Sequence, residues 1–285
     1  MASLRTYLSL VKFSHSVFAL PFAIMALLVA TDGRPSPRLL ALIVLAMVCA
    51  RTAAMAYNRL VDRDVDVLNP RTRGREIPSG VVRPAAARLL VVLASAGFVI
   101  SAGFLSRLCL YLSLPVLAVL LGYSHAKRFT SLSHAWLGLA LGLAPPAAWL
   151  AATGRFDMQL LPACWLGLGV VAWVMGFDML YACQDAAFDR AHGLRSLPAR
   201  VGVARTLIAS RCLHVVAVAL FALFGWKAGL GAVYQVGVAL AALFLGYEHR
   251  LLRADDLSRM NSAFFTMNGL VGLALLSATV LAVYV

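Results

Sequence analysis

The sequence predicts an all-α membrane protein that crosses the bilayer about nine times. Of its 285 residues, 62% are hydrophobic and only 13% are charged, which is too apolar for an ordinary soluble domain. Apolar stretches of about 20 residues recur along the chain, and each is long enough to cross a hydrocarbon core as a helix. Length alone is compatible with two soluble domains, but this hydropathy pattern argues against them.

The apolar stretches predict nine spans, most of them separated by polar connections. They cover residues 12–31, 39–57, 84–106, 108–124, 132–152, 159–182, 204–225, 229–247 and 262–285. We divide the third from the fourth at Arg107, because one apolar helix from 84 to 124 would be too long for a single crossing. The first span is expected to be retained, since it is long and lacks an Ala-x-Ala cleavage site.

Positive charges fall mainly on one side of the predicted membrane. With the N-terminus inside, 20 of the 25 Lys and Arg residues are cytoplasmic, as the positive-inside rule requires. We therefore expect a multi-pass protein of the bacterial inner membrane with a cytoplasmic active site. The net charge of +13 lies in short loops beside the membrane. It favours membrane lipid and phosphate as partners over nucleic acid.

Two groups of polar and acidic side chains lie at the ends of apolar segments, in a chain with only ten aspartates. The first group is Asn58-x3-Asp62-x3-Asp66, and the second is Tyr181-x3-Asp185-x3-Asp189. A spacing of four places the members of each group on one face of a helix. Ionised groups beside lipid are costly, so they are retained mainly where a metal, a partner charge or water compensates them.

Carboxylates at a membrane surface favour a magnesium site. Magnesium binds through one or two carboxylates together with phosphate oxygens of a substrate, and two aspartate groups are suited to a shared diphosphate. Basic side chains that can contact the outer phosphate oxygens follow the two groups or end the fourth span. They are Arg71, Arg73, Arg75, Lys127, Arg128 and Arg195. The five cysteines and six histidines show no metal-type spacing, so a zinc site has little support.

Three stretches carry a resemblance to a known family. Residues 58–80, which begin Asn-Arg-Leu-Val-Asp-Arg-Asp-Val-Asp, look like the first signature of UbiA-type intramembrane aromatic prenyltransferases. Residues 178–202 are similar to that family's second acidic helix and loop, and residues 123–130 give a third match. With nine predicted spans, the resemblance covers nearly the full chain.

The resemblance implies helices around a central cavity that is open to lipid, and a reaction at its acidic end. In that family the aspartates hold Mg²⁺ and the diphosphate of a polyprenyl donor. The matching metal residues here are Asn58, Asp62, Asp66, Asp185 and Asp189, of which the four aspartates are the expected catalytic residues. We expect Arg71, Arg75, Lys127, Arg128, Tyr181 and Arg195 to bind the diphosphate. The expected product is an aromatic ring that carries the polyprenyl group.

The expected acceptor is a hydroxylated aromatic carboxylic acid of ubiquinone or menaquinone biosynthesis. Arg51 lies two helical turns before Asn58, at an offset where 4-hydroxybenzoate prenyltransferases also carry an arginine. We expect it to pair with the acceptor carboxylate or a site aspartate, with helix packing as the alternative. His15 lies in a segment, 12–22, that resembles a sister group linked with menaquinone synthesis by the futalosine route. The resemblance therefore leaves two expected acceptors, 4-hydroxybenzoate and 1,4-dihydroxy-6-naphthoate.

Three polar residues near the acidic groups have open roles. Asp178, seven residues before Asp185, is expected either to aid metal binding or proton removal or to be structural. Tyr181 is expected either to donate to a diphosphate oxygen or to pack. Asp64 points to a different helical face from Asp62, so we expect it to be solvated or paired with an arginine.

The chain is predicted to be one domain, residues 1–285, with two related halves of about 1–130 and 131–285. Each half contains an acidic group that follows a long apolar helix and precedes a basic loop with glycine.

Two other classes of membrane protein also use carboxylates within or beside the membrane. A transporter tends to place them near the bilayer midplane, whereas these lie at the cytoplasmic end. A CDP-alcohol phosphotransferase begins its motif with Asp-Gly-x-x-Ala-Arg, which is absent here.

Overall fold

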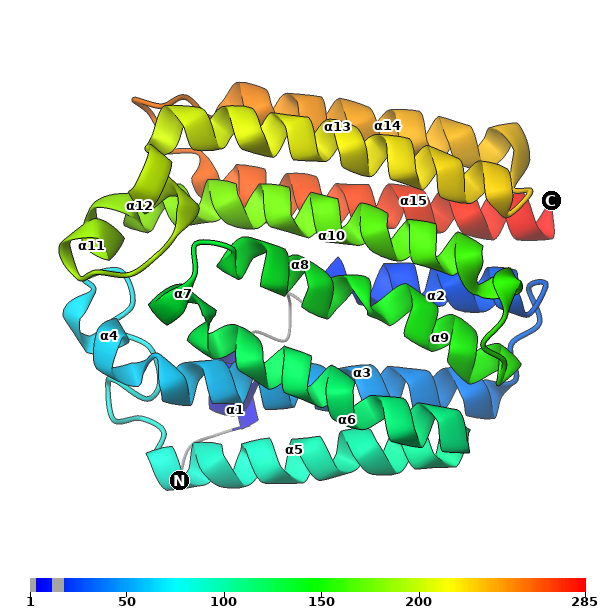
Figure 1. Cartoon of the computed structure of the whole chain (residues 1–285), viewed down its shortest axis with the longest axis horizontal. Helices are drawn as coiled ribbons and strands as arrows, with labels where there is room; N and C mark the ends of the chain where they lie inside the picture. Colours follow the sequence, from blue (N-terminus) through cyan, green and yellow to red (C-terminus); the bar gives the residue numbers. More distant parts are fainter. Residues whose placement is uncertain (1–3, 12–17) are drawn as a thin grey trace. The chain divides into compact units, whose positions relative to one another are not determined.

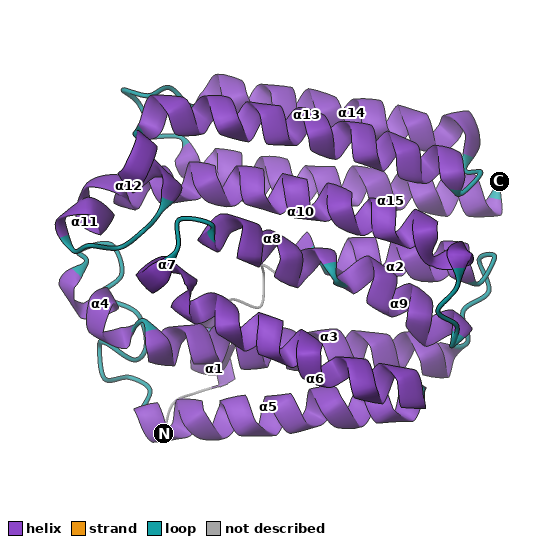
Figure 2. Ribbon diagram, viewed as in Figure 1, coloured by secondary structure: helices purple, strands orange, loops and turns teal. Residues whose placement is uncertain are grey.

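The computed structural model describes residues 4–11 and 18–285. Every regular element in these ranges is a helix (Figure 2), which confirms the predicted all-α class. The chain forms two compact units. The first unit contains the N-terminal helix and Pro37–His125, and the second contains the segment before Pro37 and Ala126–Val285.

Eight helices of the described residues are long and apolar enough to cross a membrane, so the predicted nine is approximate. The difference lies in the first predicted span. It contains α2 (Leu20–Ala30), an apolar helix of 11 residues, while residues 12–17 lie outside the described part. A helix of that length covers about 16 Å, roughly half of a hydrocarbon core.

The helices of the first unit follow the predicted spans closely. They are α1 (Leu4–Leu10), α3 (Pro37–Val61), α4 (Arg63–Leu68), α5 (Pro84–Leu105), α6 (Arg107–Gly122) and a 3₁₀ turn, Tyr123–His125. Pro84 begins α5, at a position where its missing N–H leaves no hydrogen bond unmade. Ser106 is extended and its side chain accepts from the Cys109 N–H at 3.0 Å, which caps α6. The predicted boundary at Arg107 is therefore confirmed.

A small apolar core lies beside the end of α3 in the first unit. Leu10 of α1, Ala56 of α3 and Ala87 of α5 pack with Ile77 and Val82 of the connecting loop. Burial of these side chains stabilises the loop against three helices, at roughly 25 cal/mol for each Å² of apolar surface removed from water. The loop that follows the first acidic group is consequently a packed part of the structure.

The second unit holds the remaining helices. Besides α2 they are α7 (Ala126–Phe129), α8 (Ser133–Gly142), α9 (Ala144–Thr153), a 3₁₀ turn (Met158–Leu160), α10 (Leu161–Ala182), a second 3₁₀ turn (Cys183–Asp185), α11 (Ala186–Ala191), α12 (Leu197–Val201), α13 (Val203–Lys227), α14 (Gly231–Leu251), a π-helix (Ser262–Met267) and α15 (Asn268–Tyr284). The predicted span 132–152 is interrupted at Leu143, between α8 and α9. Pro145 and Pro146 explain the interruption, because proline cannot donate to the preceding turn.

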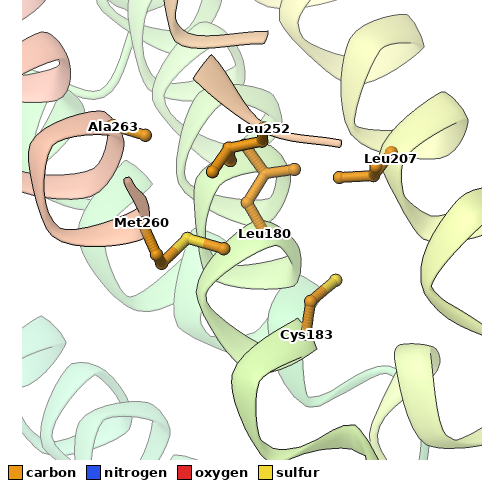
Figure 3. Close-up of a cluster of buried hydrophobic side chains, with 6 residues drawn as sticks. All are labelled: Leu180, Cys183, Leu207, Leu252, Met260 and Ala263. Carbon is orange, nitrogen blue, oxygen red and sulfur yellow. The ribbon is translucent and has the colours of Figure 1, made fainter. Parts of the chain in front are cut away.

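Helix α10 is central to the second unit. It packs along α8 and α13, and α14 packs along α15 (Figure 1). Beside its C-terminal end a buried cluster joins α10, α13, the end of α14 and the π-helix region (Figure 3). The cluster consists of Leu180, Cys183, Leu207, Leu252, Met260 and Ala263. Its packing holds the end of α10, from which the second acidic group extends.

A buried polar network lies among the same helices. The Trp173 indole N–H donates to Asn268 Oδ1 at 2.6 Å, and Asn268 Nδ2 donates to Glu248 Oε1 at 2.9 Å. Asn268 also donates to the carbonyl oxygens of Ala263 and Phe264 in the π-helix. These contacts tie the Asn268 amide to the π-helix, whose backbone hydrogen bonds run from i to i+5.

Candidate active site

The first acidic group lies where α3 ends and α4 begins. The backbone N–H of Asp62 bonds the Asn58 carbonyl at 2.9 Å, and that of Asp66 bonds the Asp62 carbonyl at 2.7 Å. These i to i+4 bonds continue the helical path, so the three residues occupy successive turns, as the spacing predicted. Asn58 Nδ2 donates to Asp62 Oδ2 at 2.9 Å. This bond orients the carboxylate and leaves the Asn58 amide oxygen available as a second ligand atom.

Asp66 is buried in an ion pair with the loop that follows it. Arg75 Nη1 donates to Asp66 Oδ1 at 2.7 Å and to Oδ2 at 2.8 Å, and the Thr72 hydroxyl donates to the Asp66 backbone carbonyl. Charge-assisted bonds of this length are among the stronger hydrogen bonds in proteins. The predicted site residues Asp66 and Arg75 are thus in direct contact, and the carboxylate is already neutralised.

Three further predicted residues of the first unit lie at separate positions on α3, on α4 and in the following loop. Arg71 is exposed, and its backbone N–H donates to Asn69 Oδ1 at 2.9 Å in a tight turn. Arg51 lies on α3, two turns before Asn58. The Asp64 side chain is 80% exposed and pairs with Arg63 at 3.3 Å, which agrees with its expected solvated role.

Arg59 is a site residue that the sequence analysis missed. It is 3% exposed, and its charge interacts with Asp62, Asp66 and Glu76 as well as with Arg75. A buried arginine is costly unless opposite charges surround it. The available signal was an arginine directly after Asn58, inside an otherwise apolar stretch.

The second acidic group occupies the corresponding place at the end of α10. The 3₁₀ turn Cys183–Asp185 leads into α11, and both Asp185 and Asp189 are buried. Gly193 has φ of +68°, and the chain then turns so that the Leu194 N–H donates to the Asp189 carbonyl at 2.8 Å. In the described part of the chain, the buried Asp189 Oδ2 has no hydrogen-bond partner.

The basic residues of the second unit gather beside the loop after Asp189. The Arg195 N–H donates to the Lys127 carbonyl and its Nη1 to the Phe129 carbonyl, both at 2.8 Å. The structure thus brings the backbones of Lys127 and Arg195 together and holds the loop between α11 and α12 against α7. Arg128 follows Lys127 on α7 and is exposed.

Two further polar residues of α10 have defined surroundings. The Tyr181 ring packs against Phe264, with ring centroids 4.4 Å apart. Asp178 Oδ2 lies 2.7 Å from Nδ1 of His134, a residue of α8 that the sequence analysis did not select. His15, the remaining candidate, lies outside the described residues.

The oxygen-rich composition of both groups fits magnesium. The described residues contain no group of three or more His, Cys, Asp or Glu side chains arranged to hold a metal ion. Each acidic group instead contributes two aspartates, and magnesium is typically bound by one or two carboxylates with phosphate and water completing its shell. The buried Asp189 Oδ2, which has no hydrogen-bond partner in the described chain, is suited to accept a cation, because buried polar atoms without partners are unfavourable.

Comparisons with known proteins agree with the motifs. The chain matches the UbiA prenyltransferase family over residues 19–270. It is 34% identical over 245 residues to the 4-hydroxybenzoate octaprenyltransferase of Methylococcus capsulatus, covering 85% of this chain and 82% of that protein.

Solved structures show the same architecture. The apo structure of a UbiA homolog from Aeropyrum pernix K1 is 37% identical, with a TM-score of 0.85 and coverage of 94% of this chain and 97% of the other. A UbiA homolog from Archaeoglobus fulgidus bound to GPP and Mg²⁺ has a TM-score of 0.77 at 18% identity, with 98% and 100% coverage. At that identity the likeness concerns the fold.

Proposed function

The chain belongs to the UbiA prenyltransferase family, and on that premise we propose that it transfers a polyprenyl group to the ring of a hydroxylated aromatic carboxylic acid. The donor is a polyprenyl diphosphate, and the reaction depends on Mg²⁺. Family membership also sets aside the transporter and the CDP-alcohol phosphotransferase as alternatives. The protein is an integral multi-pass membrane protein with eight apolar helices of spanning length in its described residues.

The main observation behind this proposal is the environment of the Asp189 carboxylate. Its Oδ2 is buried and lacks a hydrogen-bond partner within the described chain, although Lys127 and Arg195 lie beside the same loop. A carboxylate in this condition is stabilised by a cation that arrives with a ligand. A magnesium diphosphate supplies that cation, and it supplies phosphate oxygens for the neighbouring basic side chains.

Asn58, Asp62 and Asp66 of the first group, and Asp185 and Asp189 of the second, are the residues that would hold magnesium. Bound magnesium supplies neutralisation of the diphosphate charge that develops as the donor bond breaks. Arg71, Arg75, Lys127, Arg128 and Arg195 are proposed to contact the outer phosphate oxygens as charge-assisted donors. Tyr181 is proposed to contribute a hydroxyl donor to the same group.

The reaction replaces a ring proton by the polyprenyl carbon. The carbon–oxygen bond of the donor breaks, the electron pair leaves with the diphosphate, and the allylic carbon bonds to a ring carbon that the hydroxyl group activates. The ring carbon then loses its proton. Basic side chains stabilise the departing charge where it develops. Exclusion of water protects the allylic cation from capture.

Two residues are proposed to recognise the acceptor. The Arg51 guanidinium is suited to the acceptor carboxylate, because a planar donor pair matches a carboxylate's two oxygens. Asp178 is proposed to accept a hydrogen bond from the ring hydroxyl, since it lies two turns before Asp185 on α10. Both 4-hydroxybenzoate and 1,4-dihydroxy-6-naphthoate have a hydroxyl group and a carboxylate.

A single assay tests the reaction and its acceptor. Purified protein is incubated with Mg²⁺, a polyprenyl diphosphate and each acid separately, and the alkylated ring is identified by mass spectrometry. We expect one acid to gain the polyprenyl mass only when Mg²⁺ is present. Diphosphate release with water as the sole acceptor, or turnover that persists in EDTA, contradicts the proposal.

The positive-inside pattern supports a bacterial inner-membrane location with both acidic groups on the cytoplasmic side. Labelling of an introduced cysteine tests this orientation in a background that lacks the native cysteines. Ser79→Cys, in the exposed loop after the first group, is expected to react with a membrane-impermeant reagent only in inside-out vesicles. Reaction in right-side-out vesicles places the loop on the opposite side.

A further inference from the structure

Helices α8 and α10 approach each other closely along a stripe of glycines. Gly138 and Gly142 of α8 are four residues apart and share a face. A Cβ atom at Gly138 would lie 2.6 Å from the Val171 carbonyl oxygen, and one at Gly142 would lie 2.7 Å from that of Gly167. Small residues at this spacing let membrane helices pack backbone against backbone.

His134 lies on this same face of α8, one turn before Gly138. The His134 side chain therefore packs against α10 and is completely buried, at 0% exposure. Its partner on α10 is Asp178, eleven residues after Gly167 and thus three turns along the same stripe. The close approach of the two helices explains how a histidine and an aspartate 44 residues apart meet at 2.7 Å.

The hydrogen bonds of His134 define which ring nitrogen carries the proton. The Leu197 backbone N–H donates to Nε2 at 3.4 Å, so Nε2 serves as an acceptor. A neutral imidazole with an accepting Nε2 carries its hydrogen on Nδ1. That hydrogen points to Asp178 Oδ2. His134 thus donates to the aspartate while accepting from the start of α12, just beyond the loop of the second acidic group.

Asp178 keeps capacity for another partner. Its side chain is 15% exposed, in contrast with the fully buried His134. A carboxylate offers about four acceptor positions, and His134 occupies one of them. The bond from His134 fixes the direction of the carboxylate.

We infer that His134 is a positioning residue for the acceptor: it holds Asp178 so that the carboxylate accepts a hydrogen bond from the acceptor's ring hydroxyl. The inference rests on the proposed function and deepens it. His134 does not touch the acceptor, and it acts only through Asp178. The specificity it confers is for a hydroxyl hydrogen, so the methyl ether of the same acid cannot benefit from it.

The experiment compares His134→Asn with His134→Leu. The Asn side-chain NH₂ can take the place of Nδ1–H, whereas Leu fills the buried space without a donor. We measure the affinity of each protein for the acid that gives product, and for its methyl ether, in the presence of Mg²⁺ and a non-hydrolysable donor analogue. His192→Leu, at an exposed histidine in the loop after Asp189, is the matched control.

We expect His134→Leu to weaken binding of the hydroxy acid by about 10- to 100-fold, the effect of losing a hydrogen bond to a charged group, and His134→Asn to retain it within about threefold. Binding of the methyl ether should be weak and equal in all four proteins. In turnover, the KM for the acceptor should rise in His134→Leu while the KM for the donor stays unchanged.

Three results separate the possibilities. If native protein forms product and His134→Leu binds the hydroxy acid as native protein does, the positioning role is wrong and the proposed function stands. If His134→Leu loses the hydroxy acid, the ether and the donor analogue alike, His134 is a packing residue and the inference is also wrong. If native protein alkylates neither acid, the proposed function fails and the inference fails with it.

Discussion

The two acidic groups have the same position in their units but differ in how their charges are compensated. Each follows a long apolar helix, bends into a short helix and continues into a basic loop. In the first unit Arg75 binds both oxygens of Asp66. In the second unit the described residues provide no hydrogen-bond partner for Asp189 Oδ2, and Arg195 donates instead to backbone carbonyls of α7.

This difference indicates that Asp66 is neutralised by its own loop, whereas Asp189 keeps a buried oxygen that can accept a cation. For metal binding at Asp66, magnesium must compete with Arg75 for the carboxylate oxygens. Arg75, once displaced from Asp66, would be able to donate to a phosphate oxygen of the proposed substrate. The described residues give Asp189 Oδ2 no hydrogen-bond partner, so we expect this oxygen to bind a cation with less rearrangement.

The largest effect is expected on turnover. Replacing Asp185 by Asn removes a charged group that we propose to hold the metal, and we expect Mg²⁺-dependent diphosphate release to fall on the order of 1,000-fold. Asp62→Asn should have a similar effect if both groups serve one reaction. Release is measured with a phosphate-coupled assay, and the exposed Asp255 supplies the control variant Asp255→Asn. Turnover near the native rate in either variant refutes the assigned role.

The second effect concerns stability without metal and differs between the two groups. Asp66→Asn leaves Arg75 without its ion-pair partner and should lower the free energy of unfolding on the order of 1–3 kcal/mol. This is less than the cost of breaking a fully buried ion pair, because Arg75 is partly solvated. Asp189→Asn breaks no hydrogen bond of Oδ2 in the described chain and should leave stability unchanged or raised. Thermal unfolding in detergent with EDTA measures both. Equal losses would show that the compensation does not differ.

A smaller effect is expected from magnesium alone. Arg75→Gln leaves Asp66 open to a cation, so added Mg²⁺ should stabilise this variant more than the native protein, by about 1 kcal/mol through preferential binding to the folded state. The measurement is the unfolding temperature over a MgCl₂ series without diphosphate, with KCl at matched ionic strength as the control. An identical response of both proteins argues against competition between Arg75 and the metal.

The smallest effect is expected at Asp64. This exposed aspartate pairs with the partly exposed Arg63, and such surface pairs contribute about 0–1 kcal/mol. Asp64→Asn should therefore change turnover by less than about twofold and stability by less than about 0.5 kcal/mol. A loss as large as that of Asp62→Asn would place Asp64 among the metal ligands.

Local sequence signals predicted the helices well because the physical causes are local. Pro84 and the weakly marked boundary at Arg107 both correspond to observed helix limits, and the spacing of Asn58, Asp62 and Asp66 gave their shared helical path. The interruption at Leu143 was missed, although Pro145 and Pro146 could have indicated it. The first predicted span proved to contain a helix shorter than a full crossing.

Contacts between distant segments were beyond the sequence patterns. The proximity of Arg75 to Asp66 follows from the loop packing on Ile77 and Val82, which no periodicity shows. The pairing of His134 with Asp178 requires knowledge that α8 lies against α10. A partial signal existed in the spacing of His134, Gly138 and Gly142, since a small-residue stripe marks the face of a helix that meets another helix.

The Trp173–Asn268–Glu248 network has a consequence for how the chain enters the bilayer during synthesis. Glu248 lies near the end of α14 and is fully buried in the finished protein, so α14 alone would expose a carboxyl group to lipid at an energetic cost. Its donor, Asn268, is at the start of the next helix. Helices α14 and α15 are therefore expected to leave the translocation machinery as a pair, and a chain truncated after Leu251 would leave Glu248 without that donor.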